Sequence, residues 1–422
     1  MSGGEEELPL DSVYTSQQWT GLHTAIFNES KALESLRDYA RATGVAPVAL
    51  LVTTLTRLAA LSYPVTVDVG LGPTPLNLFT VLVGDSGAGK DLTIRRAGAY
   101  RFTRNGGVVE PIERPLGSGE SLVSAFIAQP EKKGEGVQIE HRALFTETEV
   151  SNADTLMRRD GSTLRQNLLK IYSGSGFGSA TKEQVHSVDA DSYSAGLIIG
   201  AQRAKVGALL DRPDDGLPHR FVWAELVDPH RPDVNRLYAP NEVALPEPGT
   251  VIEACDEAKA EFNSRKKLRL TRGYTGGLES HSLLTRARIA ALLSILRENG
   301  NSVFTDDDWG RAGALMDYSR HVRESCVDAM DTVRTIRAME KAAKAEETKD
   351  QKVRESFITA FNGKETVRVS PIKQHFRRAR ENADSVLAEM LETRAVVFAD
   401  EHHWSIRRGD GWDTYVRKHY SL

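Results

Sequence analysis

The sequence predicts an α/β fold in which a mostly parallel sheet is followed by a helical region and a small C-terminal domain. From Leu76 to Leu226, apolar runs of strand length alternate with helical stretches, the pattern of parallel strands joined by crossover helices. Residues 250–345 have a helical pattern. Residues 352–408 give three helices and then two strand-like runs.

Length and charge balance are those of an ordinary globular protein. The chain has 422 residues, enough for two or three domains, with 40% hydrophobic and 27% charged residues. Its net charge of −4, from 54 Lys+Arg against 58 Asp+Glu, excludes a uniformly basic nucleic-acid coat. Contact with nucleic acid must therefore come from a local basic patch or from the inner surface of an oligomer.

No segment predicts export or membrane insertion. The N-terminal MSGGEEELPLDS is acidic and lacks the basic-then-apolar pattern of a signal peptide. The apolar run Val48–Leu61 is shorter than the ~20 residues of a membrane span, which predicts a core helix. The two cysteines, Cys255 and Cys326, exclude a disulfide framework or a zinc ribbon. We therefore expect a cytoplasmic protein without a membrane partner.

Four segments are expected: a helical N-terminal region, an α/β core, a second helical region and a C-terminal domain, with bounds 1–63, 64–249, 250–348 and 349–422. In the first, Ser30 is expected to cap a helix, and residues 44–47 break two helices apart. Five prolines within residues 227–249 are typical of an extended linker at the end of the core.

The C-terminal segment has the element order of a winged helix-turn-helix. Val353–Phe361 is predicted to be helical. Ser370, followed by a proline, is expected to open a second helix, and Asn382 to cap a third. Two strand-like runs, Ala395–Phe398 and Trp404–Arg407, complete the predicted three helices and ribbon.

The strongest motif is LFTVLVGDSGAGKD at residues 78–91. Its glycines free the backbone so that successive N–H groups turn toward phosphate oxygens, while Lys90 reaches the β- and γ-phosphates. An apolar strand before the loop and a helix after it supply the context that the motif requires. The sequence thus predicts a P-loop NTPase that binds ATP. The expected contacts are Gly84, Asp85, Ser86, Gly87, Ala88, Gly89, Lys90, Asp91 and Leu92.

One position departs from that motif. Asp91 stands where a serine or threonine normally gives a hydroxyl to Mg²⁺. A carboxylate holds Mg²⁺ directly or through water, but it also brings negative charge close to the phosphates. Nucleotide binding is therefore better supported than fast hydrolysis.

A second acidic element follows about 60 residues downstream, in RALFTETE at 142–149. Glu147 and Glu149 lie on the same side of an extended chain, because side chains alternate along a strand. We expect Glu147 to be the Mg²⁺-side acid or catalytic base, supported by Glu149. The alternative is a strand end with solvated acids.

Two further polar residues flank predicted strands. Gln202 ends the run AGLIIGAQ, where a side chain is able to sense the γ-phosphate or orient water. Arg220 precedes the apolar run FVW and follows an Asp-Asp-Gly turn, a place from which an arginine finger reaches a neighbouring subunit's γ-phosphate. A strand-end glutamine and a surface salt-bridge arginine are the alternatives.

The sequence resembles replicative helicase-like ATPases of prophages, plasmids and other mobile elements. The resemblance rests on five motifs in this order: GDSGAGK, GSGESL, TETE, IGAQ and HRF. The resemblance covers about residues 40–345 and implies an AAA+-like core that assembles as a ring, a hexamer. Those ATPases often follow a primase-polymerase domain. None precedes this core, so any primase or initiator would be a separate partner.

The helical region is also similar to the lid of minichromosome-maintenance AAA+ helicases. TRARIAALL at 285–293, then FTDDDW and a long helix, carry that similarity. It implies that an arginine of the lid contacts the γ-phosphate, with Arg286 and Arg288 as candidates. Such helicases can also end in a winged helix.

Two regions are expected to contact DNA. Ring helicases line their pore with loops that correspond here to residues 172–186, where Phe177 would stack on a base and Lys182 would pair with phosphate. An ordinary flexible loop is the alternative. In the tail, basic side chains on the second helix and the ribbon would meet phosphates: Lys373, Arg377, Arg378 and Arg407.

The tail is not expected to read a DNA sequence. Acids on its third helix, such as Asp384 and Glu389, oppose deep major-groove binding, so non-specific DNA contact or protein docking is expected. The whole sequence favours an ATP-dependent helicase acting on single- or double-stranded DNA. A slow nucleotide switch that loads a helicase, and an ATP-regulated DNA-binding initiator, remain alternatives.

Overall fold

The chain divides into two compact units, Met1–Met330 and Asp331–Leu422. The computed structural model describes residues 13–128, 134–180, 184–211, 215–229, 231, 239–273, 279–298 and 302–419. Helix α11 (Asp306–Ala360) contributes residues to both units. The expected boundary at 348/349 therefore falls inside a helix.

The first unit is built on a parallel five-stranded sheet, which confirms the predicted α/β class. Its strands lie in the order β14-β3-β13-β10-β6, with bounds Phe221–Glu225, Leu78–Val83, Ser194–Ala201, Arg142–Glu147 and Ile112–Pro115. Every residue of β3, β13 and β14 is buried, which explains why these strands are predominantly apolar in sequence. The expected strands at 76–83, 143–145 and 196–200 correspond to β3, β10 and β13.

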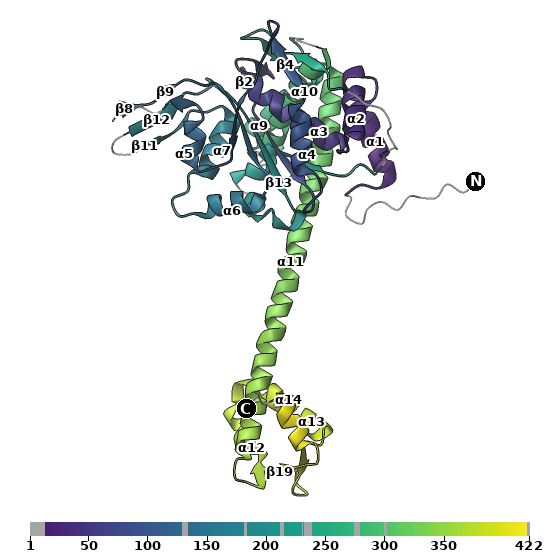
Figure 1. Cartoon of the computed structure of the whole chain (residues 1–422), viewed down its shortest axis with the longest axis vertical. Helices are drawn as coiled ribbons and strands as arrows, with labels where there is room; N and C mark the ends of the chain where they lie inside the picture. Colours follow the sequence, from purple (N-terminus) through teal and green to yellow (C-terminus); the bar gives the residue numbers. More distant parts are fainter. Residues whose placement is uncertain are drawn as a thin grey trace, which may run out of the picture. The chain divides into compact units, whose positions relative to one another are not determined.

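Helices pack around this sheet (Figure 1). They include α1 (Ser16–Phe27), α2 (Lys31–Ala42), α3 (Pro47–Leu61), α4 (Lys90–Gly98), α5 (Gly119–Ser124), α6 (Val150–Arg158), α7 (Leu164–Ser173), α8 (Gly207–Leu210), α9 (Asp256–Arg272) and α10 (Glu279–Glu298). Among the described residues, no single helix is long and apolar enough to cross a membrane. Within the described residues, the consecutive helices α2 and α3 together have the length and apolar composition of a membrane span, but the chain bends by 117° between them.

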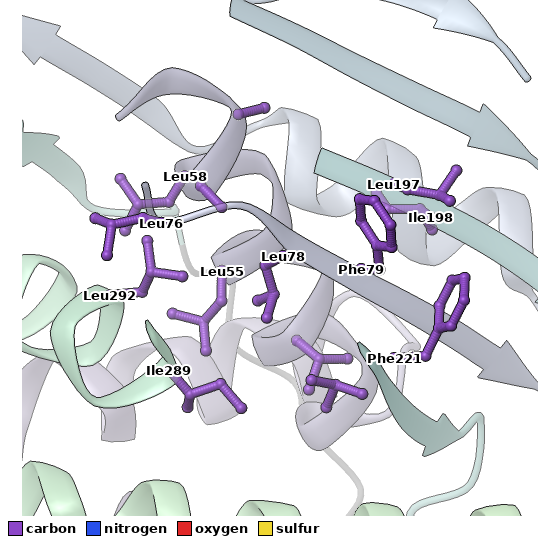
Figure 2. Close-up of a cluster of buried hydrophobic side chains, with 14 of the residues drawn as sticks. Leu55, Leu58, Leu76, Leu78, Phe79, Leu197, Ile198, Phe221, Ile289 and Leu292 are labelled. Atoms are coloured by element: carbon purple, nitrogen blue, oxygen red, sulfur yellow. The ribbon is translucent and has the colours of Figure 1, made fainter. Parts of the chain in front are cut away.

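Helix α3 packs directly on the sheet, and all 15 of its residues are buried. Gly196 of β13 allows the approach, because a Cβ atom at that position would lie 2.5 Å from the Thr56 carbonyl oxygen. Figure 2 shows the apolar side chains gathered here: Leu55, Leu58, Leu76, Leu78, Phe79, Leu197, Ile198, Phe221, Ile289 and Leu292. Helix α3 is thus part of the core, and the expected N-terminal region is not separate from it.

The opposite face of β3 is covered by α7. Leu78 and Phe79 point to opposite faces, because side chains alternate along a strand. Phe79 packs edge-on against Tyr172 of α7, with ring centroids 5.6 Å apart, and against Phe221 of β14. The sheet is therefore buried on both sides, as parallel sheets generally are.

Smaller sheets lie beside the central one. They are β16-β1-β2 (Val251–Glu253, Thr66–Asp68, Thr74–Pro75), β15-β4-β5 (Glu242–Ala244, Arg101–Arg104, Gly107–Val108), β11-β12-β8 (Phe177–Ala180, Gln184–Val188, Gly134–Glu135) and β7-β9 (Ile127–Ala128, Val137–Gln138). Strand β15 lies inside the predicted linker, so part of that stretch is a paired strand. Strands β11 and β12 are antiparallel and include part of residues 172–186, where a pore loop is expected.

The second unit contains the last part of α11 and a small antiparallel sheet, β17-β19-β18. Its elements after α11 are β17 (Thr366–Arg368), α12 (Val369–His375), α13 (Arg380–Glu392), β18 (Val396–Phe398), β19 (Ser405–Arg408) and α14 (Trp412–His419). Val353 and Phe357 of α11, and Phe361 directly after it, pack in one core with Val386 and Met390 of α13. Strand β17 and helix α14 are additional to the predicted helices and ribbon.

Both helix caps predicted in this unit are wrong, whereas Ser30 is the N-cap of α2 as expected. Helix α12 begins at Val369, so Ser370 lies inside its first turn. Asn382 lies inside α13, where its buried amide donates to Asp350 Oδ1 (2.7 Å) and to Glu346. A capping residue type is here used to join two helices.

The close packing of α3 predicts that Gly196→Ala destabilises the first unit. The added methyl group meets a backbone carbonyl that cannot rotate away, and overpacking of this kind costs about 1–3 kcal/mol. We expect a lower urea midpoint for unfolding. Gly21→Ala in α1 is the matched control, because its Cβ meets nothing within 4 Å and alanine favours the helix. Equal midpoints for wild type and Gly196→Ala would show that α3 is not seated on β13.

Candidate functional site

The glycine loop, residues 84–90, joins the end of β3 to the start of α4. Gly87 and Gly89 have φ values of 82° and 94°, in the left-handed region that favours glycine. Gly89 is the N-cap residue of α4, so the first backbone N–H groups of this helix face the loop. Residues 85–88 are exposed. The loop thus presents backbone donors at the positive end of a helix, an arrangement that favours phosphate.

The Lys90 ammonium group is folded into this loop. Its Nζ donates to the carbonyl oxygens of Gly84 (2.8 Å) and Asp85 (2.9 Å), and the residue is 7% exposed. A charged donor forms stronger hydrogen bonds with charged acceptors than with neutral carbonyls. Phosphate oxygens in the loop would therefore be preferred partners for Lys90.

Gly200 brings Lys90 to the ends of two strands. A Cβ atom on Gly200 would lie 2.7 Å from Lys90 Cδ and 2.5 Å from the Thr148 carbonyl oxygen. Gly200 belongs to β13, and Thr148 directly follows β10. The missing side chain therefore allows the lysine stem and the end of β10 to meet above β13.

Glu147 is the last residue of β10 and is half-buried. Its Oε1 accepts from the Glu149 backbone N–H (3.0 Å) and from Asn152 Nδ2 (3.3 Å). Glu149 itself is exposed and is the N-cap residue of α6. The Glu147 carboxylate is thus directed toward the start of α6, and its other oxygen, Oε2, makes none of these bonds.

Gln202 lies at the same edge of the sheet as the glycine loop. It directly follows β13 and is half-buried. Ala201 pairs with Val83, and Gly84 N donates to the Ala201 carbonyl oxygen at 3.0 Å. The structure therefore brings together the loop, Gln202 and the end of β10, which are separate in sequence.

The residues of this edge fit a nucleoside triphosphate with Mg²⁺. The loop offers backbone donors, a lysine and the N-terminus of the nine-residue helix α4. Asp91 is exposed in the first turn of that helix. No group of three or more metal-ligating side chains occurs in the described residues.

Arg220 is not placed as an arginine finger. It is 7% exposed, and its guanidinium donates to the Asp215 carbonyl oxygen (3.1 Å) and to His281 Nε2 (3.1 Å). The guanidinium also lies 5.5 Å from the centre of the Tyr172 ring. A finger must project from the surface, so burial contradicts this predicted role.

The two predicted lid arginines are also occupied. Arg288 is fully buried, donates to the Asn77 carbonyl oxygen at 3.0 Å and stacks on Tyr172. This environment contradicts contact with a phosphate. Arg286 lies 3.7 Å from the centre of the Trp309 ring and donates to the Trp309 carbonyl oxygen and to Glu261. Both arginines hold α10 in place.

Arg220 belongs to a buried ionic cluster that the sequence did not predict. Burial opposes the ionised form of Asp215, but hydrogen bonds from Arg165 and from the Leu217 backbone outweigh it and lower the pKa of this carboxyl. Burial, then nearby arginines, lowers the pKa of His219 and of His281 to about 4. Asp215, His219 and Arg220 are close in sequence, but Arg165 and His281 come from distant segments, so only the fold completes this cluster.

Of the two expected pore contacts, the structure describes Phe177 alone. Phe177 is 3% exposed and packs on Phe126 and Tyr193, with centroids 5.9 and 5.3 Å away. The ring fills a core, so the stacking role predicted for it is wrong. Lys182 lies outside the described residues.

In the second unit, Arg377 and Arg407 are exposed as expected, whereas Lys373 forms an ion pair with Asp384. The side chain of Arg378 lies outside the described residues.

Comparisons with known protein families and with curated proteins found no match for this chain.

The two half-buried histidines, His219 and His281, predict an acid-sensitive first unit. Arginine only donates, so His281 and His219 must accept from Arg220 and Arg323 as neutral rings. Their folded pKa of about 4 is below the unfolded value of about 6.5, so the unfolded chain binds more protons between these pH values. The free energy of unfolding should therefore fall as pH falls from 6.5 to 4.

His281→Gln keeps an acceptor for Arg220 but cannot titrate, so its melting temperature should fall less than that of wild type between pH 7 and 4.5. His402→Gln, at an exposed site in the second unit, is the control and should follow wild type. If all three proteins lose the same number of degrees, His281 is not held neutral in the fold.

Proposed function

We propose that this chain is an ATP-dependent DNA helicase or translocase with an AAA+-like P-loop core. It acts in the replication of a phage or other mobile element and assembles as a hexameric ring. The observation that carries the proposal is the position of Lys90. It lies where the glycine loop, the end of β13 and the end of β10 meet. Ligands of open parallel sheets bind at the carboxyl ends of their strands, which is this edge.

In this proposal the chain's residues bind and orient a nucleotide. Bound ATP supplies a γ-phosphoryl group whose transfer to water is strongly favourable. The backbone N–H groups of the loop and Lys90 neutralise phosphate charge. Glu147 holds and polarises the attacking water through its Oε2, and Gln202 orients the same water. Asp91 takes the place of the hydroxyl ligand beside Mg²⁺, either directly or through water.

DNA contact is proposed from the resemblance and from the second unit. The order of α11, α12, α13 and the β18–β19 ribbon supports the proposed winged helix, and exposed arginines lie on that unit. Because Arg220 and Arg288 are occupied inside the fold, the proposal assigns neither of them to the phosphates. A ring would draw its γ-phosphate arginine from another position.

The second candidate function is a slow nucleotide switch that loads or positions a helicase. Asp91 favours it, because an exposed carboxylate in the first turn of α4 places negative charge where phosphates would lie. The hydrogen bonds that Glu147 Oε1 accepts from Glu149 and Asn152 also hold the proposed base toward α6. Both features would slow hydrolysis without preventing binding.

ATP turnover measured with and without single-stranded DNA separates the two functions. For a motor, DNA should stimulate turnover, and Lys90→Ala and Glu147→Gln should each lower it by about 10²-fold or more. Glu140→Gln is the matched control, because Glu140 lies before the opposite end of β10. Tight ATP binding with negligible turnover, with or without DNA, would contradict the motor and leave the switch.

Substitution of Asp91 tests the role of its charge. Asp91→Thr restores the hydroxyl and removes the negative charge, so ATP should bind about fivefold more tightly and turnover should rise. Asp91→Asn removes the charge without adding a hydroxyl and should improve binding alone. Weaker ATP binding by both variants would instead show that the carboxylate holds the metal ion.

A further inference from the structure

A groove in the second unit combines positive charge with an exposed aromatic ring. It has a volume of about 730 Å³ and lies between α12, the start of α13 and the turn before β19. The lining residues that matter here are Arg368, Lys373, Arg377, Arg380, His403 and Trp404. No carboxylate is among the residues that line it.

The cations of this groove are mostly uncompensated. Arg368, Arg377 and Arg380 are exposed, and none of them forms an ion pair with a residue that the structure describes. Lys373 alone is paired, with Asp384. Three exposed arginines that form no ion pair with a described carboxylate favour an anionic ligand. Arg368 ends β17, Arg377 lies between α12 and α13, and Arg380 begins α13, a spread that suits a chain of phosphates better than a single one.

Trp404 is exposed by a well-defined turn. Asp400 accepts from the backbone N–H groups of His402 (3.0 Å), Trp404 (3.0 Å) and Ser405 (2.6 Å). The Trp404 carbonyl oxygen in turn accepts from Val369 N at 3.0 Å, which ties the turn to the start of α12.

His403, the residue before Trp404, stabilises the turn. His403 has φ of 60°, and its ring stacks on Phe398 with centroids 3.9 Å apart. Trp404 is nevertheless 72% exposed. Burying an indole stabilises a fold, so a fixed turn that keeps one in solvent has no explanation in stability. A ligand that stacks on the ring explains it.

We infer that this groove binds single-stranded DNA, with an unpaired base stacked on Trp404 and the adjoining phosphates held by Arg368, Arg377 and Arg380. A basic groove with an exposed aromatic ring is the chemistry by which proteins hold unpaired strands, since only an unpaired base offers its face. The choice of DNA over RNA rests on the proposed function. The stacking residue is therefore in the turn before β19, and not at Phe177.

The fluorescence of Trp404 can be followed in the whole 422-residue chain. The chain has five tryptophans, and the other four are buried: Trp19, Trp223 and Trp309 are 0% exposed and Trp412 is 9% exposed. Acrylamide quenching of tryptophan fluorescence should therefore report mainly Trp404. An oligothymidylate of about 12 nucleotides should quench this emission and protect it from acrylamide, whereas a blunt duplex of equal length should not.

Substitutions then separate stacking from charge. Trp404→Ala should weaken binding of a labelled oligothymidylate about 5- to 150-fold, and Trp404→Phe should restore most of it. Arg377→Ala should weaken binding and lower the slope of log affinity against log salt by about 0.7, the value for one phosphate contact. Arg417→Ala, an exposed arginine outside the groove, is the matched control.

Two results would overturn the inference: unchanged binding by Trp404→Ala, or equal protection of Trp404 by duplex and single strand. The variant Lys90→Ala tests DNA binding in the groove separately from ATP turnover. It should abolish ATP turnover while leaving the protection of Trp404 as in wild type. Protection without any ATP turnover in wild type would refute the motor alone, and DNA-stimulated turnover without protection would refute the groove alone.

Discussion

The first unit depends on two missing side chains on one face of β13. Gly196 and Gly200 are four residues apart and therefore point to the same side of the sheet. The first lets the backbone of α3 rest on the strand, and the second lets Lys90 and Thr148 meet above its end. Core packing and the candidate site thus share one constraint, since a Cβ atom at either glycine would push away the backbone of α3 or the Lys90 side chain.

Charge inside this unit serves the fold rather than the candidate site. Arg220 and Arg288 both lie against Tyr172, and Arg286 lies against Trp309. Each guanidinium has a flat apolar surface and several donors, so it can stack on a ring and satisfy backbone carbonyls at once. The helix α10 is therefore joined to the sheet by arginines that sequence patterns typically assign to ligands.

The arrangement of the sheet edge that carries the glycine loop could be predicted because its signals are local. The strand β3, the glycine loop and α4 are contiguous, and the ends of β10 and β13 are each marked by a buried run followed by a polar residue. What could not be predicted depends on contacts between distant segments. Burial of Arg288 and Phe177, and the placement of Asn382 against α11, follow from packing. The exposure of Trp404 is equally invisible in sequence, because an indole near a strand is usually a core residue.

The hydrogen bonds of Lys90 have a consequence for how strongly any phosphate can be held. Two of the three N–H groups of the ammonium already donate to carbonyl oxygens of its own loop, at 2.8 and 2.9 Å. A phosphate oxygen that takes either donor replaces a carbonyl, so for that bond only the difference between phosphate and carbonyl as partners contributes to affinity. The affinity of such a site is therefore tuned by the carbonyl oxygens of the loop's own backbone.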